Sequence, residues 1–238
     1  MTSIAANMQA VIGRISRACA AVGRDPREVA LLAVSKTWPA AALREAAAAG
    51  QRAFGENYVQ EALVKIGALR PLGLEWHFIG PLQGNKTRAV AENFAWVHSV
   101  DRLKIAERLA AQRLAGLPPL NVCVEIKVSG EASKSGVVPN EALALCRAVA
   151  ALPGLRLRGL MAIPEPASAT GPESAVARRR FAQLRELRDE LNGTGLGMDT
   201  LSMGMSHDME DAIMEGATIV RVGTAIFGAR AVAGAQAG

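Results

Sequence analysis

The hydrophobic residues of this chain fall into short continuous runs separated by longer stretches of helical periodicity. In Ala30-Leu31-Leu32-Ala33-Val34, five apolar residues follow one another with no polar residue between them. Strands that are buried on both faces have this pattern, as in parallel sheets covered by helices. Such runs, together with other short β-like segments, predict eight strands, at Val29–Val34, Arg52–Phe54, Glu75–Ile79, Trp96–Ser99, Asn121–Val128, Arg156–Met161, Thr200–Met203 and Thr218–Val222.

Between these runs, apolar residues recur every three or four positions, which is the spacing of an amphipathic helix. A leading helix over Ile4–Val22 places Met8, Val11 and Ile15 on one face, and Gly23 ends it. Further helices are predicted at Pro39–Ala49, Tyr58–Leu69, Asp101–Leu114, Asn140–Ala151, Ala175–Leu191 and His207–Glu215.

Strands that alternate with helices are joined by right-handed crossovers and form a parallel sheet. Eight such units in 238 residues predict a single closed (β/α)8 TIM barrel with an extra N-terminal helix. A doubly wound open sheet is the alternative, but no Gly-x-Gly-x-x-Gly turn follows the first strand. Because no change of composition marks a second domain, we expect one domain over residues 1–238, with a disordered tail at 231–238.

The composition is that of an ordinary soluble globular protein, with 50% hydrophobic and 21% charged residues. Cys19, Cys123 and Cys146 have the spacing of neither a disulfide framework nor a metal site, which fits a reducing compartment. The first residues lack the pattern of a signal peptide, and no apolar run is long enough to span a membrane. We therefore expect a cytoplasmic monomer without a metal ion.

The net charge of +5 raises the alternative of a nucleic-acid-binding protein. The one basic cluster, at 178–180, lies in a predicted helix that also carries Glu186 and Asp189, as a solvated helix face does. No aromatic residues alternate with the arginines to stack on bases. We expect no nucleic-acid partner, and a steep loss of binding with salt would mark the alternative.

A lysine stands just after the first predicted strand, in Val34-Ser35-Lys36-Thr37. In barrels of this type the working face lies at the carboxyl ends of the strands. Apolar walls there lower the pKa of an amine, and the neutral amine can condense with an aldehyde to form a Schiff base. Taken alone, Lys36 is better explained as a snorkelling or salt-bridged residue, and other features must support the Schiff-base role.

The last two strands are followed by residues suited to an anion. Ser206 precedes a predicted helix, where it can cap the helix or bind a phosphate, and both roles are compatible. Gly223 lets the backbone approach a ligand, and Thr224 supplies a hydroxyl. The loops after strands seven and eight are the recurrent phosphate site of these barrels.

Lys36 on one side and this predicted phosphate site on the other suit a phosphorylated aldehyde such as pyridoxal 5′-phosphate. Arg221 lies between them and would face the pyridine nitrogen. A permanent cation cannot accept the ring proton, so it would keep the nitrogen unprotonated and weaken the cofactor as an electron sink. This arrangement favours holding the cofactor over amino-acid chemistry.

At these positions the chain closely resembles the pyridoxal-phosphate homeostasis protein family, a barrel similar to that of alanine racemase. The resemblance extends from the leading helix to about Arg230. Its segments are 33–37, 54–61, 76–86, 98–101, 134–136, 159–161, 201–208 and 220–228.

The resemblance implies that Lys36 is the Schiff-base lysine, that Ser206, Gly223 and Thr224 hold the phosphate, and that Arg221 faces the ring nitrogen. It further implies that Asn57 and His77 line the ring pocket, although His77 can equally be a hydrogen-bonded core residue. The family is associated with cytoplasmic supply of the cofactor, which makes apo forms of pyridoxal-phosphate enzymes expected partners.

The sequence also bears on whether the protein is an enzyme. Related racemases take a second base, a tyrosine, from an added domain, whereas the single tyrosine here is Tyr58, early in the chain. We therefore expect a carrier or regulator of the cofactor. A small amino-acid racemase or lyase of the same fold is the alternative.

Overall fold

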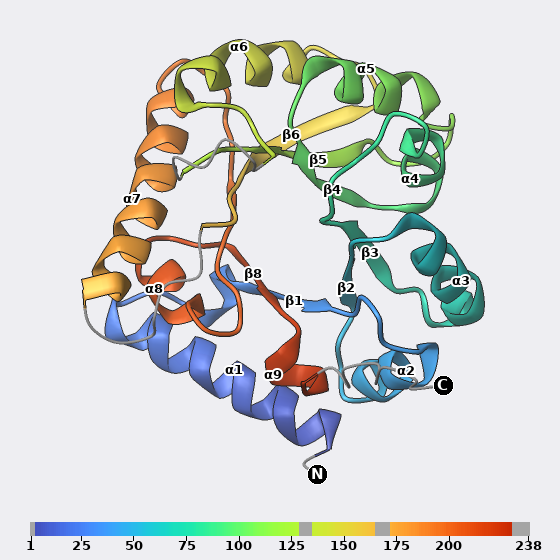
Figure 1. Cartoon of the computed structure of the whole chain (residues 1–238), viewed down its shortest axis with the longest axis vertical. Coiled ribbons are helices and arrows are strands. Elements are labelled where there is room, and N and C mark those ends of the chain that lie inside the picture. Colours follow the sequence, from blue (N-terminus) through green and yellow to red (C-terminus); the bar gives the residue numbers. More distant parts are fainter. Residues whose placement is uncertain (1–2, 129–134, 165–171, 230–238) are drawn as a thin grey trace, which may run out of the picture.

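A computed structural model describes residues 3–128, 135–164 and 172–229, so the predicted disordered tail lies outside the described residues. Parallel strands close into a barrel in chain order, with β8 pairing back onto β1 (Figure 1). The strands are β1 (Ala30–Val34), β2 (Ala53–Glu56), β3 (Glu75–Phe78), β4 (Trp96–Val100), β5 (Leu120–Glu125), β6 (Leu155–Met161), β7 (Thr200–Ser202) and β8 (Ile219–Val222). The predicted TIM barrel is confirmed, and the doubly wound alternative is wrong.

Helices surround the strands on the outside of the barrel. They are α1 (Ile4–Ala21), α2 (Ala40–Ala48), α3 (Val59–Leu69), α4 (Thr87–Asn93), α5 (Leu103–Gln112), α6 (Pro139–Ala150), α7 (Pro172–Asn192), α8 (Met209–Met214) and α9 (Thr224–Phe227), with 3-10 turns at Pro26–Glu28 and Arg70–Leu72. The sequence pattern did not predict α4 and α9, because two turns or fewer contain too few apolar residues to define a period.

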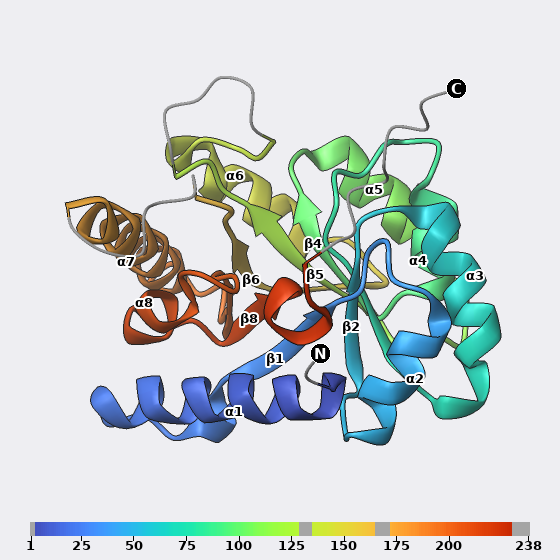
Figure 2. The same cartoon turned by 60° about the horizontal axis from the view of Figure 1, so that its bottom comes forward.

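The extra N-terminal helix α1 packs along the outside of the barrel against α8, α9 and α2 (Figure 2). Its buried residues, among them Met8, Val11 and Ile15, recur at the predicted helical spacing. Ser3 caps the helix by accepting a hydrogen bond from the amide of Ala6. The helix therefore braces the last two β/α units from outside.

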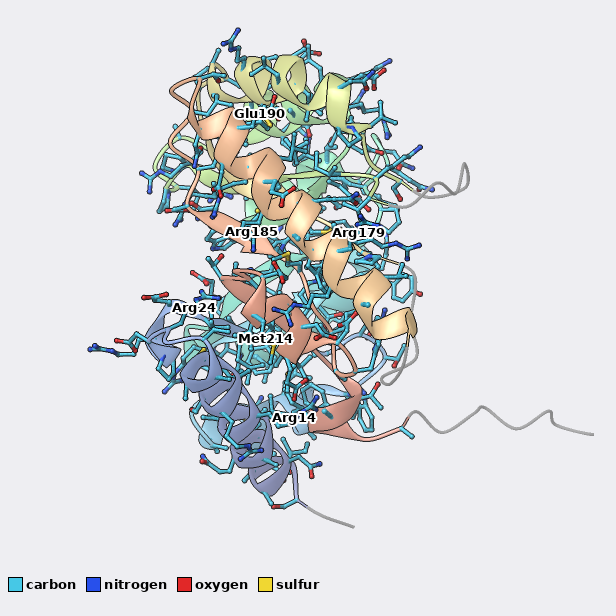
Figure 3. The ribbon with its side chains drawn as sticks, turned by 90° about the vertical axis from the view of Figure 1, so that its left-hand side faces the viewer. Arg14, Arg24, Arg179, Arg185, Glu190 and Met214 are labelled. Carbon is cyan, nitrogen blue, oxygen red and sulfur yellow. The ribbon has the colours of Figure 1, made fainter. Side chains whose placement is uncertain are left out.

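Helices α7 and α8 lie side by side (Figure 3), and ion pairs join the basic face of α7 to the end of α8. Arg178 Nε lies 2.7 Å from Glu215 Oε1, and Arg185 contacts the other oxygen of the same carboxylate. Glu215 is largely buried, and the two arginines hold its pKa below the usual value against the opposing effect of burial. Part of the cluster thus joins two helices.

Two apolar layers meet at the sheet. The larger lies between the strands and the helices, and the smaller fills the barrel lumen with Leu32, Ile79, Trp96, Cys123, Met161 and Ile219. Cys123 is fully buried in this layer, and burial raises the pKa of its thiol to about 12. The lumen also holds polar side chains. They are unusual there, because branched aliphatic residues dominate the interiors of such barrels.

Candidate functional site

A cavity of about 260 Å³ opens at the carboxyl ends of β1, β2 and β8. Its described lining residues are Val34, Lys36, Asn57, Ile79, Ile163, Met205, Ser206, His207, Arg221, Gly223 and Thr224. Six of the seven predicted site residues are therefore brought together, from positions as distant in the chain as Lys36 and Thr224. The volume is near the lower end for ligand pockets, about 300 to 1,000 Å³, and suits one small molecule.

The loop that carries Lys36 has a constrained backbone. Thr37 has a φ of 68°, in the left-handed region that β-branched residues rarely occupy. Its amide donates a 2.5 Å hydrogen bond to Glu61 Oε1, and a bond to a carboxylate is stronger than a neutral one. Glu61 on α3 thus offsets the cost of this conformation next to Lys36.

A buried ion pair supports the same loop from below. Lys65 Nζ lies 2.7 Å from Glu56 Oε1 and 2.6 Å from Glu61 Oε1, and it donates to the carbonyl of Ser35 at 2.7 Å. The Ser35 hydroxyl donates to Glu56 Oε1 at 2.6 Å. Burial raises the pKa of Glu56, and the bonds from Lys65 and Ser35 oppose that rise. The backbone on both sides of Lys36 is therefore bonded to this cluster.

Ser206, which also lines the cavity, lies in the loop between β7 and α8. The prediction that it caps the following helix is wrong, because α8 begins at Met209 and Asp208 occupies the capping position. The Ser206 hydroxyl instead accepts a 3.4 Å hydrogen bond from the amide of Ala225 in α9. The loop after β7 and the start of α9 are thus joined at the predicted phosphate position.

Helix α1 fastens both of these segments from outside the barrel. Arg14 donates from Nη2 to the carbonyl of Ser206 at 2.9 Å and forms a two-bond ion pair with Glu210 (Figure 3). Asn7 donates to the carbonyl of Ile226 at 2.8 Å. Sequence reasoning missed Arg14 and Asn7, because neither lies at a strand end.

Gly223 and Thr224 begin α9 directly after β8. A Cβ atom at Gly223 would lie 3.1 Å from the Val34 carbonyl oxygen, tighter than nearly all real contacts. The absence of a side chain therefore lets the end of β8 come close to the end of β1. This approach brings Thr224 to the same cavity as Lys36.

Arg221 points from β8 into the lumen beneath the cavity and is 4% exposed. Its Nη1 donates to Ser202 Oγ at 2.8 Å, and its Nη2 donates to the carbonyl of Ala162 at 2.9 Å. Burial lowers the pKa of the guanidinium to about 10, which leaves it charged at neutral pH. The cavity therefore has a fixed cation at its floor.

Asn57 supplies a polar group without a protein partner. Its side-chain oxygen Oδ1 is buried and accepts no hydrogen bond, although Asn57 lines the cavity. Buried polar atoms nearly always have a partner, so this oxygen marks a place where a ligand donor fits. Gly80 lets the Asn57 backbone lie this deep, since a Cβ at Gly80 would be 2.4 Å from its carbonyl oxygen.

His77 is not among the described residues that line the cavity, so the cavity gives no support to the expectation that it lines the ring pocket. It is 3% exposed in the lumen and both ring nitrogens are engaged, Nδ1 by His98 Nε2 at 2.9 Å and Nε2 by Glu75 Oε1 at 2.8 Å. These contacts are those of a hydrogen-bonded core residue, which was the alternative for His77. The reason is depth: His77 comes two residues before the loop, so its ring lies below the cavity, whereas Ile79 reaches it.

Sequence reasoning did not name several residues that complete the cavity. Val34, Ile79, Ile163 and Met205 supply apolar walls, and the exposed His207 lies at the rim. Position offered a signal, because Val34 and Ile79 end or follow strands whose neighbours were already candidates. Apolar character did not distinguish them from core residues.

Other site classes find no support in the part of the chain that the structure describes. Within 3–128, 135–164 and 172–229, no three His, Cys, Asp or Glu side chains are grouped as a metal site. Across the same residues, no helix is long and apolar enough to cross a bilayer.

Comparison with known proteins agrees with this architecture. The chain matches the family model of the alanine racemase N-terminal domain over residues 6–231. It is 64% identical over 230 residues to the pyridoxal phosphate homeostasis protein of Pseudomonas aeruginosa, covering 97% of each chain. It is 55% identical over 233 residues to the Escherichia coli K12 protein of that name, covering 97% of this chain and 98% of that one.

A solved structure extends the likeness to three dimensions. PipY of Synechococcus elongatus PCC7942, determined with PLP bound, is 41% identical and superposes with a TM-score of 0.78 over 90% of this chain and 100% of PipY. The resemblance seen in the sequence is confirmed. The chain belongs to the pyridoxal phosphate homeostasis protein family, within the alanine racemase N-terminal domain family.

Proposed function

We propose that this protein binds pyridoxal 5′-phosphate as a Schiff base on Lys36 and buffers or supplies it within the cytoplasm. The observation that carries the proposal is the cavity in which Lys36, at the end of β1, is brought together with Ser206, Gly223 and Thr224 at the ends of β7 and β8. An amine and a set of anion-binding groups in one cavity suit a phosphorylated aldehyde. PipY, a family member with PLP bound, supports the choice of ligand.

Each group of the cavity has a role in this proposal. Lys36 holds the aldehyde carbon, and the hydroxyls of Ser206 and Thr224 with the Gly223 backbone hold the phosphate. Arg221 faces the ring nitrogen, and the unpartnered oxygen of Asn57 accepts a hydrogen bond from the ligand. When bound, the cofactor supplies an electron-withdrawing ring, and a neighbouring guanidinium keeps the ring nitrogen unprotonated.

The lining favours a carrier over a racemase or lyase. Among the described lining residues, Lys36 and His207 are the side chains suited to pass a proton near neutral pH, and His207 is exposed at the rim. A racemase needs two bases on opposite faces of the substrate. We infer that the protein acts as a monomer, which holds the cofactor and then passes it to apo forms of pyridoxal-phosphate enzymes.

The test of the binding site is reduction with borohydride followed by peptide mapping. Purified protein loaded with pyridoxal phosphate should carry the reduced cofactor on Lys36. Lys36→Ala should lose the label and the absorbance band while keeping its circular dichroism, and Lys86→Ala should retain both. A label that persists in Lys36→Ala on another lysine would contradict the assignment.

The test of the carrier role compares transfer with chemistry. The loaded protein should reactivate an apo-enzyme, while the α-proton of alanine exchanges with deuterium only at the rate given by free cofactor. Exchange well above that rate, lost in Lys36→Ala, would make the protein an amino-acid enzyme.

A further inference from the structure

A continuous hydrogen-bonded chain of side chains crosses the barrel lumen beneath the cavity. From the cavity floor it runs from Arg221 Nη1 to Ser202 Oγ at 2.8 Å and from Ser202 Oγ to His98 Nδ1 at 2.7 Å. From His98 Nε2 it passes to His77 Nδ1 at 2.9 Å and from His77 Nε2 to Glu75 Oε1 at 2.8 Å. It therefore joins the cation beneath the cavity to a carboxylate at the opposite end of the barrel.

Strand geometry places these residues in one line. Glu75 and His77 are two residues apart on β3, so both face the lumen, and His98 lies beside them on β4. Ser202 and Arg221 face them from β7 and β8 across the barrel. Glu75 begins its strand with a half-exposed side chain, whereas His98 and Ser202 are fully buried.

When both imidazole rings are neutral, the donors and acceptors permit a single direction of hydrogen-bond donation along the chain. The Glu75 carboxylate can only accept, so a neutral His77 donates to it from Nε2 and accepts from His98 at Nδ1. A neutral His98 then accepts the Ser202 proton at Nδ1, and Ser202 Oγ accepts from the Arg221 guanidinium. The proton of His98 is then on Nε2 and is donated to His77 Nδ1.

The surroundings keep both rings neutral. Burial lowers the pKa of His77, against the opposing effect of Glu75, and lowers that of His98 well below its ordinary value. Trp96 stacks on His77 at a ring-centroid distance of 5.3 Å and an interplanar angle of 6°, which fixes the ring plane. Arg158 on β6 lies 4.8 Å over the same Trp96 ring, and its charge also lowers the pKa of Glu75.

We propose that Ser202, His98, His77 and Glu75 act as positioning residues that fix the Arg221 guanidinium for recognition of the ligand's ring. Every link donates away from the cavity, so the chain holds Nη1 of Arg221 against Ser202. Nη2 donates to the Ala162 carbonyl, and the remaining N–H groups of the guanidinium are left for the ring edge. A polar chain in the lumen is costly unless each member is satisfied, and each link of this one pairs a donor with an acceptor. The proposal rests on the proposed function for the identity of the ligand.

The direction of the chain can be tested without any ligand. Long-range proton–nitrogen NMR of histidine-labelled protein at pH 7.5 distinguishes the two neutral tautomers. The protein has three histidines, so the loss of one signal in His77→Asn and of another in His98→Asn assigns all three. His77 and His98 should both carry the proton on Nε2. A proton on Nδ1 of either neutral ring, or a charged ring, would contradict the proposed direction of donation along the hydrogen-bonded chain.

The positioning role is tested by ligand selectivity. Ser202→Ala should weaken pyridoxal phosphate about three- to tenfold, while a benzaldehyde analogue with phosphate but no ring nitrogen binds as to the wild type. Cys123→Ala, a fully buried lumen residue outside the chain, is the matched control and should leave the ratio of the two affinities unchanged. Equal weakening of both ligands in Ser202→Ala would reduce the chain to a structural element and refute the proposal.

A pH titration supplies a further readout. Protonation of His77 makes both of its nitrogens donors, which reverses the His98 link and leaves the Ser202 proton without this acceptor. Selectivity for pyridoxal phosphate should therefore decrease as the pH is lowered past the pKa of His77, which burial holds below the ordinary imidazole value of 6.5. Besides Glu75 and Arg158, the charges near the chain are Glu125 and Asp208, which face Arg221. Glu125→Gln should keep the fall, and unchanged selectivity at a pH where the NMR signals show a charged His77 ring would contradict the mechanism. If the wild type binds no pyridoxal phosphate, the proposed function fails. The NMR measurement of the His77 and His98 tautomers needs no ligand and still tests the hydrogen-bonded chain.

Discussion

The buried ion pair beneath the Lys36 loop gives a prediction whose magnitude can be worked out. Lys65 and Glu56 have side-chain exposures of 5% and 0%, and Lys65 also bonds Glu61 and the Ser35 carbonyl. Lys65→Met keeps the length of the side chain but leaves the Glu56 carboxylate buried without its cation. Breaking a buried pair in this way costs about 3–5 kcal/mol. A domain of this size loses about 2–4 °C of melting temperature per kcal/mol, so Tm should fall by roughly 6–20 °C.

Two further variants make the prediction specific. Burial already raises the pKa of Glu56, so in Lys65→Met this carboxyl can take up a proton, and the cost at pH 5 should be smaller than at pH 8. Lys65→Met combined with Glu56→Gln removes both charges and should recover at least half of the loss. Lys104→Met, on the exposed surface of α5, should change stability by less than about 0.5 kcal/mol.

The measurement is guanidinium denaturation followed by circular dichroism at both pH values. A loss below about 1 kcal/mol for Lys65→Met would show that the pair contributes little. A double variant as unstable as the sum of the two single variants would refute the coupling between the charges.

Two other predictions concern titration and the outer brace. Burial, reinforced by Asp101, raises the pKa of Glu125 from 4.5 to about 7, so the folded protein holds a proton that the unfolded chain releases. Stability should fall by up to about 3 kcal/mol as pH rises from 4.5 through 7, and urea titrations should show Glu125→Gln without this fall. Arg14→Met removes the bond to the Ser206 carbonyl and a half-exposed ion pair, so calorimetry should find affinity for pyridoxal phosphate lowered about three- to tenfold. Unchanged affinity would mean that α1 does not hold the loop.

The barrel could be predicted from the sequence because its determinants are local and repeated. Several strands are apolar runs, as in Ala30–Val34, and most long helices show a periodic apolar face. Short elements such as α4 and α9 carry too few residues for either signal. The ends of strands were predicted within a few residues for the same reason.

The site was predictable where position alone decides. Lys36, Ser206, Arg221 and Gly223 all follow or end strands, and strand ends meet at one face of a barrel. Depth within the lumen was not predictable. His77 looked like a pocket residue because its segment resembled the family, whereas its actual partners come from β4 and from its own strand.

Closure of β8 onto β1 also constrains when the site can exist. The register pairs Leu32 with Arg221 and Ala33 with Val222, so Lys36 and the proposed phosphate-binding residues Gly223 and Thr224 become neighbours only when β8 pairs with β1. A nascent chain still attached to the ribosome therefore has Lys36 long before it has Gly223 and Thr224. Ligand capture then reports completed closure, and the free energy of binding stabilises the seam between the first and last strands by mass action. Cofactor supply would act on this barrel as a quality check at the end of its own folding.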